Sequence, residues 1–239
     1  KSKIQFNHPV HIEQIEDDIT KGIYFDANIP MRSGLGSSGA LCAAIYEKYA
    51  LPFENYSTEQ LVKVCDDLKV MEACFHGKSS GLDPLTCYLQ KPLYVHNSEV
   101  FPLKMNESPI TLFLIDTGIE SDTTTGVKHF TEKLNDTEFL YQLHHVLIPL
   151  NNQLISLYRR NSINEFFAIF DTYMNRQLEI FPEVIPENFI DIIHEGSIND
   201  LFRMKICGSG RGGFLLGFTV QPEKSIMYWK QRGKQAIVI

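Results

Sequence analysis

The glycines of this chain gather at three places, which indicates where the backbone could bind a ligand. Nine of the 15 glycines lie within residues 34–39, 77–81 and 208–213. Glycine is favoured where the backbone needs a positive φ angle or must approach another group closely. Three such segments in one chain predict a site built largely from backbone atoms.

The first glycine segment, Pro30–Gly39, is predicted to join a strand to a helix. Free N–H groups and the positive dipole end at the start of a helix bind anions, phosphate in particular. Ser37 and Ser38 can add hydroxyl contacts, and one of them could reach a metal. The alternative from these residues alone is a tight turn capped by serines.

Two common nucleotide motifs do not account for this segment. Its GLGSSG string satisfies the Rossmann pattern GxGxxG, but the acidic residue at the required spacing, Glu54, lies in a stretch typical of a loop. A Walker A loop requires a lysine before the serine, and none is present.

Two carboxylates flank the second glycine segment. Glu72 falls near the predicted end of a helix, where the dipole disfavours a carboxylate, so it points to solvent or meets a cation. Asp83 follows a Ser-Ser-Gly turn. One carboxylate for Mg²⁺ and one beside a reacting hydroxyl are what ATP-dependent phosphoryl transfer requires. The alternatives are a surface glutamate, a turn-capping aspartate and a structural His76.

The third segment, Lys205–Phe214, precedes a predicted buried strand. It also satisfies GxGxxG, but no strong helix follows it, so a Rossmann site is not indicated. Taken alone, it fits a glycine hairpin or bulge equally well.

Composition excludes several classes of protein. The chain has 239 residues and a net charge of −7, so it lacks the basic stripe that nucleic-acid binding needs. No apolar run approaches the roughly 18–20 residues of a membrane span. The five cysteines form no CxxC pair, which argues against a zinc site or a disulfide framework. We expect a cytoplasmic protein with a small-molecule partner.

Hydrophobic periodicity predicts an α+β chain. We expect strands at 3–6, 22–29, 92–95, 111–115, 214–220 and 235–239, helices up to residue 49, over 58–75 and over 222–232, and a short element over 82–89. Ser57 and Gln60 form a capping box for the second of these helices. Three or four helices are expected between 126 and 195, broken near Pro149 and 182–186.

Together the three segments resemble motifs of the GHMP kinases. That family has a Pro-x-x-x-Gly-Leu-Gly-Ser-Ser phosphate loop, found here at 30–38, and a late Lys-x-x-Gly-x-Gly-x-Gly-Gly segment, found here at 205–213. The order and spacing of Glu72, His76, Gly77, Gly81 and Asp83 are most similar to the pattern of the mevalonate kinases within that family.

The resemblance implies a role for each matching residue. Gly34, Leu35, Gly36, Ser37, Ser38, Gly208, Ser209 and Gly210 would bind ATP; Ser38 and Glu72 would hold Mg²⁺; Asp83 would be the catalytic base; and His76, Asp83 and Thr123 would contact the substrate. ATP and Mg²⁺ are therefore the expected cofactors.

The fold implied by the resemblance has two α+β domains. Residues 1–105 would form an N-terminal domain with a left-handed βαβ crossover, and residues 106–239 a C-terminal ferredoxin-like domain. Because the family's first motif is missing, we expect the sequence to be incomplete at its N-terminus. The resemblance also allows a homodimer.

The implied reaction is ATP-dependent phosphorylation of a small-molecule hydroxyl, with mevalonate converted to 5-phosphomevalonate in isoprenoid biosynthesis. Phosphomevalonate or a sugar is the alternative acceptor, and a non-catalytic nucleotide sensor is a further alternative. Four positions depart from the family pattern: Gly39 replaces an alanine, Ser79 replaces a proline, Pro84 replaces an asparagine and Arg211 replaces a glycine.

Overall fold

The computed structural model describes residues 6–51, 57–97, 99–103 and 108–239. The chain divides into two compact units, which are described separately. Unit 1 comprises Lys1–Pro30 and Gly36–Asn106, and unit 2 comprises Met31–Leu35 and Glu107–Ile239. The first glycine segment is therefore shared, because its first half belongs to unit 2 and its second half to unit 1.

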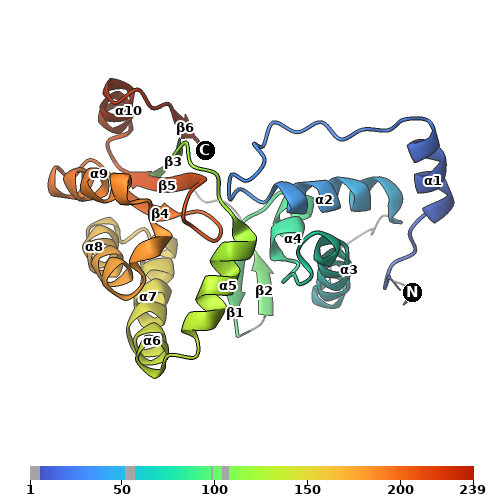
Figure 1. Ribbon diagram of the computed structural model, residues 1–239, viewed down its shortest axis with the longest axis horizontal. Helices are drawn as coiled ribbons and strands as arrows, with labels where there is room; N and C mark the ends of the chain where they lie inside the picture. Colours follow the sequence, from blue (N-terminus) through green and yellow to red (C-terminus); the bar gives the residue numbers. More distant parts are fainter. Residues whose placement is uncertain (1–5, 52–56, 98, 104–107) are drawn as a thin grey trace. The chain divides into compact units, whose positions relative to one another are not determined.

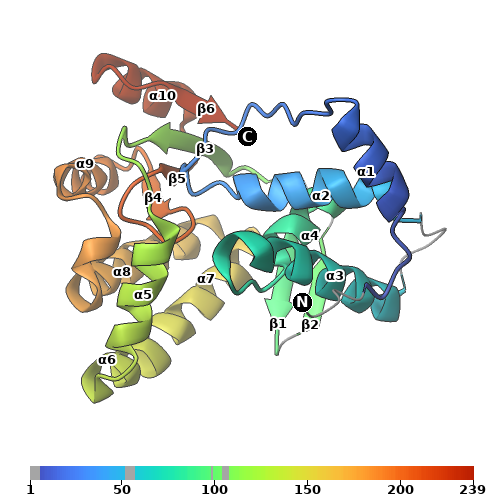
Figure 2. The same cartoon turned by 45° about the vertical axis from the view of Figure 1, so that its right-hand side comes forward.

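Unit 1 is mainly helical. Its elements are α1 (Ile12–Thr20), α2 (Ser37–Tyr49), α3 (Thr58–His76), α4 (Leu82–Leu89) and the antiparallel strands β1 (Leu93–His96) and β2 (Glu99–Pro102). Helix α4 packs against both α2 and α3 (Figure 2). A small core of Cys42, Tyr46, Val64, Leu68 and Leu85 joins these three helices. Burial of these apolar side chains therefore fixes the positions of the N-terminal ends of the helices relative to one another.

Unit 2 is built on a four-stranded antiparallel sheet (Figure 1). Its elements are β3 (Thr111–Asp116), α5 (Thr123–Lys133), α6 (Thr137–Gln142), a π-helical turn (Leu143–Leu147), α7 (Ile148–Arg159), α8 (Ile163–Ile180), a 3-10 turn (Pro182–Val184), α9 (Glu187–Ile198), β4 (Arg203–Ile206), β5 (Phe214–Thr219), α10 (Pro222–Gln231) and β6 (Ala236–Val238). The strand order β4-β5-β3-β6 and the β-α-β-β-α-β succession are those of a ferredoxin-like domain.

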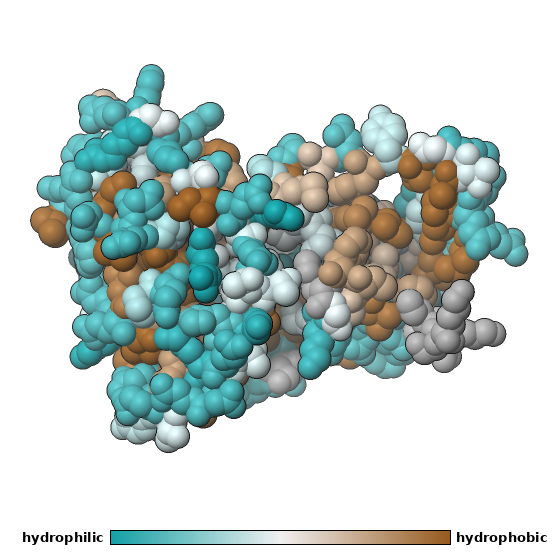
Figure 3. Space-filling model, in the orientation of Figure 1, coloured by the Kyte–Doolittle hydropathy of each residue, from teal (hydrophilic) through white to brown (hydrophobic). Residues whose placement is uncertain are grey.

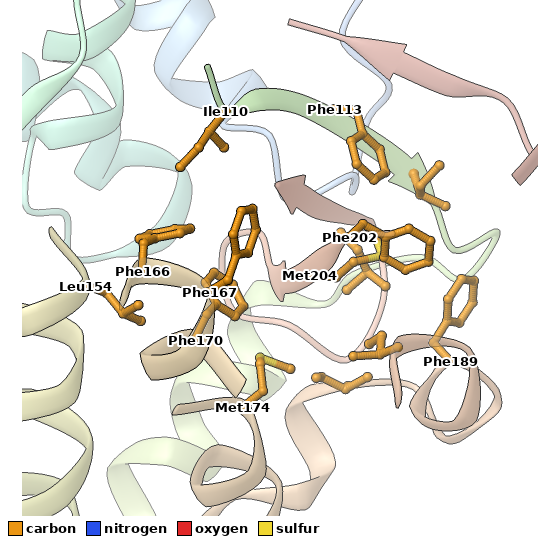
Figure 4. Close-up of a cluster of buried hydrophobic side chains, with 14 of the residues drawn as sticks. Ile110, Phe113, Leu154, Phe166, Phe167, Phe170, Met174, Phe189, Phe202 and Met204 are labelled. Atoms are coloured by element: carbon orange, nitrogen blue, oxygen red, sulfur yellow. The ribbon is translucent and has the colours of Figure 1, made fainter. Parts of the chain in front are cut away.

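An aromatic core holds the helices of unit 2 to this sheet (Figure 4). Phe113 of β3 meets Phe202 edge to face, with 6.0 Å between ring centroids. Phe202 also packs on Trp229 of α10, whose side chain is fully buried. Such aromatic pairs contribute about 0.5–1.5 kcal/mol each beyond their area burial.

Most elements predicted from periodicity are confirmed. The helices α2, α3, α4 and α10 and the strands β1, β3, β5 and β6 lie within a few residues of their expected bounds. The capping box of Ser57 and Gln60 at the start of α3 is also confirmed. The two-domain α+β architecture expected from the resemblance is present. The described part of unit 1 contains only the antiparallel pair β1–β2, so the left-handed crossover is not represented among these residues.

The prediction for residues 1–30 is wrong where the structure describes them. Residues 3–5 lie outside the described part, Phe6 is in no strand, and 22–29 form none. Instead, Ile12, Ile15 and Ile19 follow a helical repeat along α1. Ile12 and Ile19 stay exposed, and Figure 3 shows apolar surface over this helix.

The break expected near Pro149 is also absent. The chain stays helical from Thr137 to Arg159, with the π-helical turn inserted before α7. Pro149 is the second residue of α7, where a missing N–H is tolerated when the preceding turn already departs from α-helical pairing. Two short strands, β2 and β4, were not predicted. No helix among the described residues has the length and apolarity to cross a bilayer.

Candidate active site

The second half of the first glycine segment forms the start of α2. Gly36 is the N-cap residue with φ +71°, a left-handed conformation that favours glycine. Its carbonyl accepts the N–H of Ala40 at 2.9 Å and so closes the first turn. Ser37, Ser38 and Gly39 occupy that turn, where N–H groups have no acceptor within the helix and can serve an anion.

Ser38 and Glu72 meet between α2 and α3. The Ser38 hydroxyl donates to Oε1 of Glu72 at 3.2 Å, and only 6% of Glu72 is exposed. Among the described residues Glu72 forms no ion pair within 4.0 Å. A buried carboxylate beside a hydroxyl is a hard-oxygen donor pair that fits Mg²⁺, which usually takes few protein ligands and completes its shell with phosphate and water. No group of three or more His, Cys, Asp or Glu side chains in the described part forms a metal cage.

Asp83 lies against the N-terminal end of α2. It sits in the first turn of α4, and its side chain is exposed. The position that a Cβ would take on Gly36 is 3.4 Å from Oδ2 of Asp83. A Cβ on Gly39 would lie 3.0 Å from Cβ of Asp83 and 2.9 Å from the backbone nitrogen of Pro84. Because Gly36 and Gly39 have no side chains, Asp83 can lie directly against the start of α2.

The second glycine segment forms the turn between α3 and α4. Gly77 ends α3 with φ +74°, and Gly81 is the N-cap of α4 with φ +77°. A Cβ on Gly81 would lie 2.6 Å from the carbonyl oxygen of Cys65, so α4 begins in close contact with α3. The backbone of His76 ends α3, whereas its side chain lies outside the described part of the chain.

Ser79 contacts Glu72, and the sequence did not predict this contact. Its hydroxyl donates to Oε2 of Glu72 and accepts the N–H of Gly81 at 2.8 Å. A serine two residues before a turn glycine is a common ST-turn signal, and nothing in the sequence indicates that its hydroxyl reaches back to Glu72.

The first half of the first glycine segment is hydrogen-bonded to the third glycine segment within unit 2. Phe214 donates its N–H to the carbonyl of Ser33 at 2.9 Å. A Cβ on Gly34 would lie 2.9 Å from the carbonyl oxygen of Cys207, and one on Gly208 would lie 3.1 Å from the carbonyl oxygen of Gly34. Gly34 and Gly208 thus allow two backbone segments to touch, and residues 31–35 are fixed beside the sheet.

The remaining glycines of the third segment also make room for the protein's own backbone. Cβ atoms on Gly210 and Gly212 would lie 2.5 Å from Val184 O and 2.6 Å from Ile119 O. Arg211 between them is exposed, has φ +66° and donates its N–H to the Val184 carbonyl at 2.7 Å. Close packing against these carbonyl oxygens requires glycine at both positions.

Ser209 and Thr123 lie at the start of α5 in unit 2. The oxygens of Ser209 and Ser121 are 3.5 Å apart, and Gly126 of α5 leaves room for Ser209. Thr123 is the first residue of α5 and is exposed. The N-cap residue, Asp122, accepts the Thr125 hydroxyl and the backbone N–H groups of Thr124 and Thr125, and these hydrogen bonds, that of the Thr125 hydroxyl first, hold the pKa of Asp122 below its usual value.

The structure thus divides the predicted site residues between the units. Unit 1 brings together Gly36, Ser37, Ser38, Glu72 and Asp83. Unit 2 contains Gly34, Leu35, Thr123, Gly208, Ser209 and Gly210. Burial raises the pKa of the Cys207 thiol, which precedes Gly208, to about 11, so it is a neutral neighbour of this segment.

Comparison with known proteins places these features in a family context. Residues 6–91 match the model of the GHMP kinases N terminal domain. The fold is similar to that of Leishmania major mevalonate kinase in complex with R-mevalonate (TM-score 0.60, 17% identity, 82% of this chain and 61% of that one). It is also similar to the Lin0012 protein from Listeria innocua (TM-score 0.60, 14% identity, 83% and 63%) and to mevalonate kinase from Staphylococcus aureus MRSA252 (TM-score 0.50, 17% identity, 92% and 72%).

Because these structures are only 14% to 17% identical to this chain, they show that the fold is shared and nothing more. The chain spans about three fifths of the length of the first two structures. No curated protein matches the chain significantly in sequence.

Proposed function

We propose, from the premise that this chain belongs to the GHMP kinases through its N-terminal domain, that it transfers the γ-phosphoryl group of ATP to a hydroxyl of a small molecule. The observation that carries the proposal is the meeting of three groups in unit 1. A phosphate-type helix start, a buried carboxylate bonded to its serine and a second carboxylate beside its glycine lie together.

The helix start and the Ser38–Glu72 pair would bind ATP with its metal. Backbone N–H groups at Ser37, Ser38 and Gly39 suit the phosphates of ATP, since they point out of the helix end. Ser38 and Glu72 would hold Mg²⁺, which supplies charge neutralisation on the transferred phosphoryl group when it is bound. Gly34, Leu35, Gly208, Ser209 and Gly210 of unit 2 are also proposed to bind ATP, on the strength of the family pattern.

Asp83 is proposed as the base that accepts the proton of the acceptor hydroxyl. Its carboxylate lies against the glycines of the loop that would bind the phosphates. A base there can orient the hydroxyl toward the phosphoryl group, and such positioning is the main source of catalysis in phosphoryl transfer. His76 and Thr123 are proposed acceptor contacts from the family pattern.

We propose mevalonate as the acceptor. The spacing from Glu72 to Asp83 follows the mevalonate kinase pattern, and two structures of similar fold carry that name. ATP, Mg²⁺ and the acceptor are the ligands that the proposal requires.

The test is ATP-dependent ADP release, measured with a coupled assay on mevalonate, phosphomevalonate and galactose. Asp83→Asn should lower kcat by at least a hundredfold, the range of a lost general base. Asp66→Asn is the matched control, because Asp66 is exposed on α3 and faces no proposed ligand. Activity on galactose without activity on mevalonate would refute the acceptor, and an Asp83→Asn enzyme within tenfold of wild type would refute the base. Nucleotide binding without turnover of any acceptor would favour a sensor.

A further inference from the structure

Both oxygens of Glu72 are held, each by a serine from a different part of unit 1. The Ser38 hydroxyl on α2 donates to Oε1 at 3.2 Å, and the Ser79 hydroxyl in the turn before α4 donates to Oε2. Each serine therefore binds a different oxygen of the carboxylate. One oxygen faces the phosphate loop, and the other faces the turn that leads to Asp83.

Ser79 is itself fixed by the start of α4. Its oxygen accepts the N–H of Gly81 at 2.8 Å. Gly81 lies in close contact with α3, since a Cβ there would be 2.6 Å from the carbonyl oxygen of Cys65. The Cys65 thiol also donates to the carbonyl of Ser80 at 3.7 Å. A continuous hydrogen-bonded path therefore runs from the first turn of α4 through Ser79 to Glu72.

We propose that Ser79 is a positioning residue for the metal-binding carboxylate. By occupying Oε2, it leaves Oε1, the oxygen beside Ser38, as the one presented to a divalent cation. The same hydroxyl accepts the N–H of Gly81, two residues before Asp83. Ser79 therefore also fixes the position of Glu72 relative to the start of the helix that contains Asp83. Ser79 has this role only if Glu72 serves the proposed kinase function as a cation ligand, so the inference rests on that function.

The consequence is a defined loss of metal affinity when the Ser79 hydroxyl is removed. Without its donor, the Oε2 side of a nearly buried carboxylate has no partner, and the side chain can turn away from Ser38. Groups that orient a metal ligand typically change metal affinity by roughly 10–100-fold. We expect Ser79→Ala to weaken Mn²⁺ binding by about tenfold or more and to raise the Mg²⁺ concentration needed for half-maximal activity, with a smaller effect on kcat at saturating Mg²⁺.

The experiment follows free Mn²⁺ by electron paramagnetic resonance with saturating ADP, corrected with a protein-free ADP blank. Ser79→Thr keeps the hydroxyl and should restore the affinity. Ser80→Ala is the matched control from the same turn, since Ser80 is exposed and its oxygen accepts only the N–H of Leu82, at 3.3 Å, among the hydrogen bonds of the described residues. Glu72→Gln sets the level of a lost ligand.

The outcomes separate this inference from the proposed function. Ser79→Ala within twofold of wild type, while Glu72→Gln loses Mn²⁺, would overturn the positioning role and leave the kinase proposal intact. Equal losses in Ser79→Ala and Ser80→Ala would also overturn it, because loosening of the turn would then be the cause. A wild-type chain that binds neither ADP nor Mn²⁺ would refute the kinase proposal and the inference together. A metal-free double-mutant cycle on unfolding should show coupling between Ser79 and Glu72, and additive effects would contradict the contact.

Discussion

Gly213 offers a direct test of whether the third glycine segment holds residues 31–35 of the first glycine segment in place. A Cβ at this position would lie 2.2 Å from the carbonyl oxygen of Ser33, and the residue has φ +69°. That carbonyl accepts the N–H of Phe214 at 2.9 Å, and Gly213 donates its own N–H to Ile119 at 2.6 Å. Gly213→Ala must therefore displace residues 31–35 from the end of β5.

The cost follows from two separate effects. An alanine in the left-handed region costs about 1–2 kcal/mol. Moving the Ser33 carbonyl breaks its bond to Phe214, and a buried backbone group left unpaired costs about 1–3 kcal/mol. We expect Gly213→Ala to lower the free energy of unfolding of unit 2 by about 2–5 kcal/mol.

Gly233 is a matched control for the first effect alone. It has φ +71°, and a Cβ there would meet no atom within 4 Å. Gly233→Ala should therefore cost about 1–2 kcal/mol, and the difference between the two variants isolates the contact with Ser33.

The assay is urea unfolding followed by the fluorescence of Trp229, the one tryptophan of the chain, which is fully buried in unit 2. With a slope of about 2 kcal/mol per molar urea, the midpoint of Gly213→Ala should lie on the order of 1 M below that of Gly233→Ala. Equal midpoints would refute the reasoning, because they would mean that the loop is not held by this contact. We also expect Gly213→Ala to weaken ATP binding.

Two further predictions concern stability. Asp67 is 1% exposed and accepts hydrogen bonds from the backbone N–H groups of Asn7 and His8, the Asn7 amide and the Tyr46 hydroxyl, so it anchors residues 7–8 to α3. Asp67→Ala should lower the free energy of unfolding, followed by circular dichroism, by roughly 3 kcal/mol. The exposed neighbour change Asp66→Ala should cost under about 0.5 kcal/mol, and similar costs for the two variants would contradict this anchoring role. The hydrogen bond from the Tyr228 hydroxyl, followed by the hydrogen bond and charge of Arg232, lowers the pKa of Glu195 below 4.5. The ionised Glu195 carboxylate therefore contributes its full stabilisation above pH 4.5, and this contribution is lost as the pH falls through the lowered pKa. Tyr228→Phe should accordingly reduce the drop in the urea midpoint between pH 7 and roughly pH 3, and an unchanged drop would count against this linkage.

The pattern of apolar and capping residues was sufficient to predict most of the fold. Helix α3 has a capping box, a regular apolar face and a terminating glycine, so local signals agree over its whole length. Residues 22–29 contain β-branched and aromatic residues, yet no strand pairs with them among the described residues. Propensity for a strand has no effect without a neighbouring strand. The helix α1 was missed although its isoleucines have helical spacing.

For the candidate site, the residue types and their order can be read directly from the sequence. The local pattern made Ser38, Glu72 and Asp83 candidates, and the resemblance to the GHMP kinases implied their roles. Which of these groups touch depends on the packing of the helices. Ser38 and Glu72 are 34 residues apart and meet because α2 and α3 pack on one core, and Ser79 joins them because Gly81 fixes the start of α4.

The glycines show the same division. Their number and clustering are properties of the sequence, and they indicated three places where backbone must come close to something. What it approaches is set by folding: Asp83 at Gly36 and Gly39, Cys65 at Gly81, and Ser33 at Gly213. A missing side chain leaves space that a ligand or the protein's own backbone can fill. No local signal distinguishes the two, because the partner comes from a distant part of the chain.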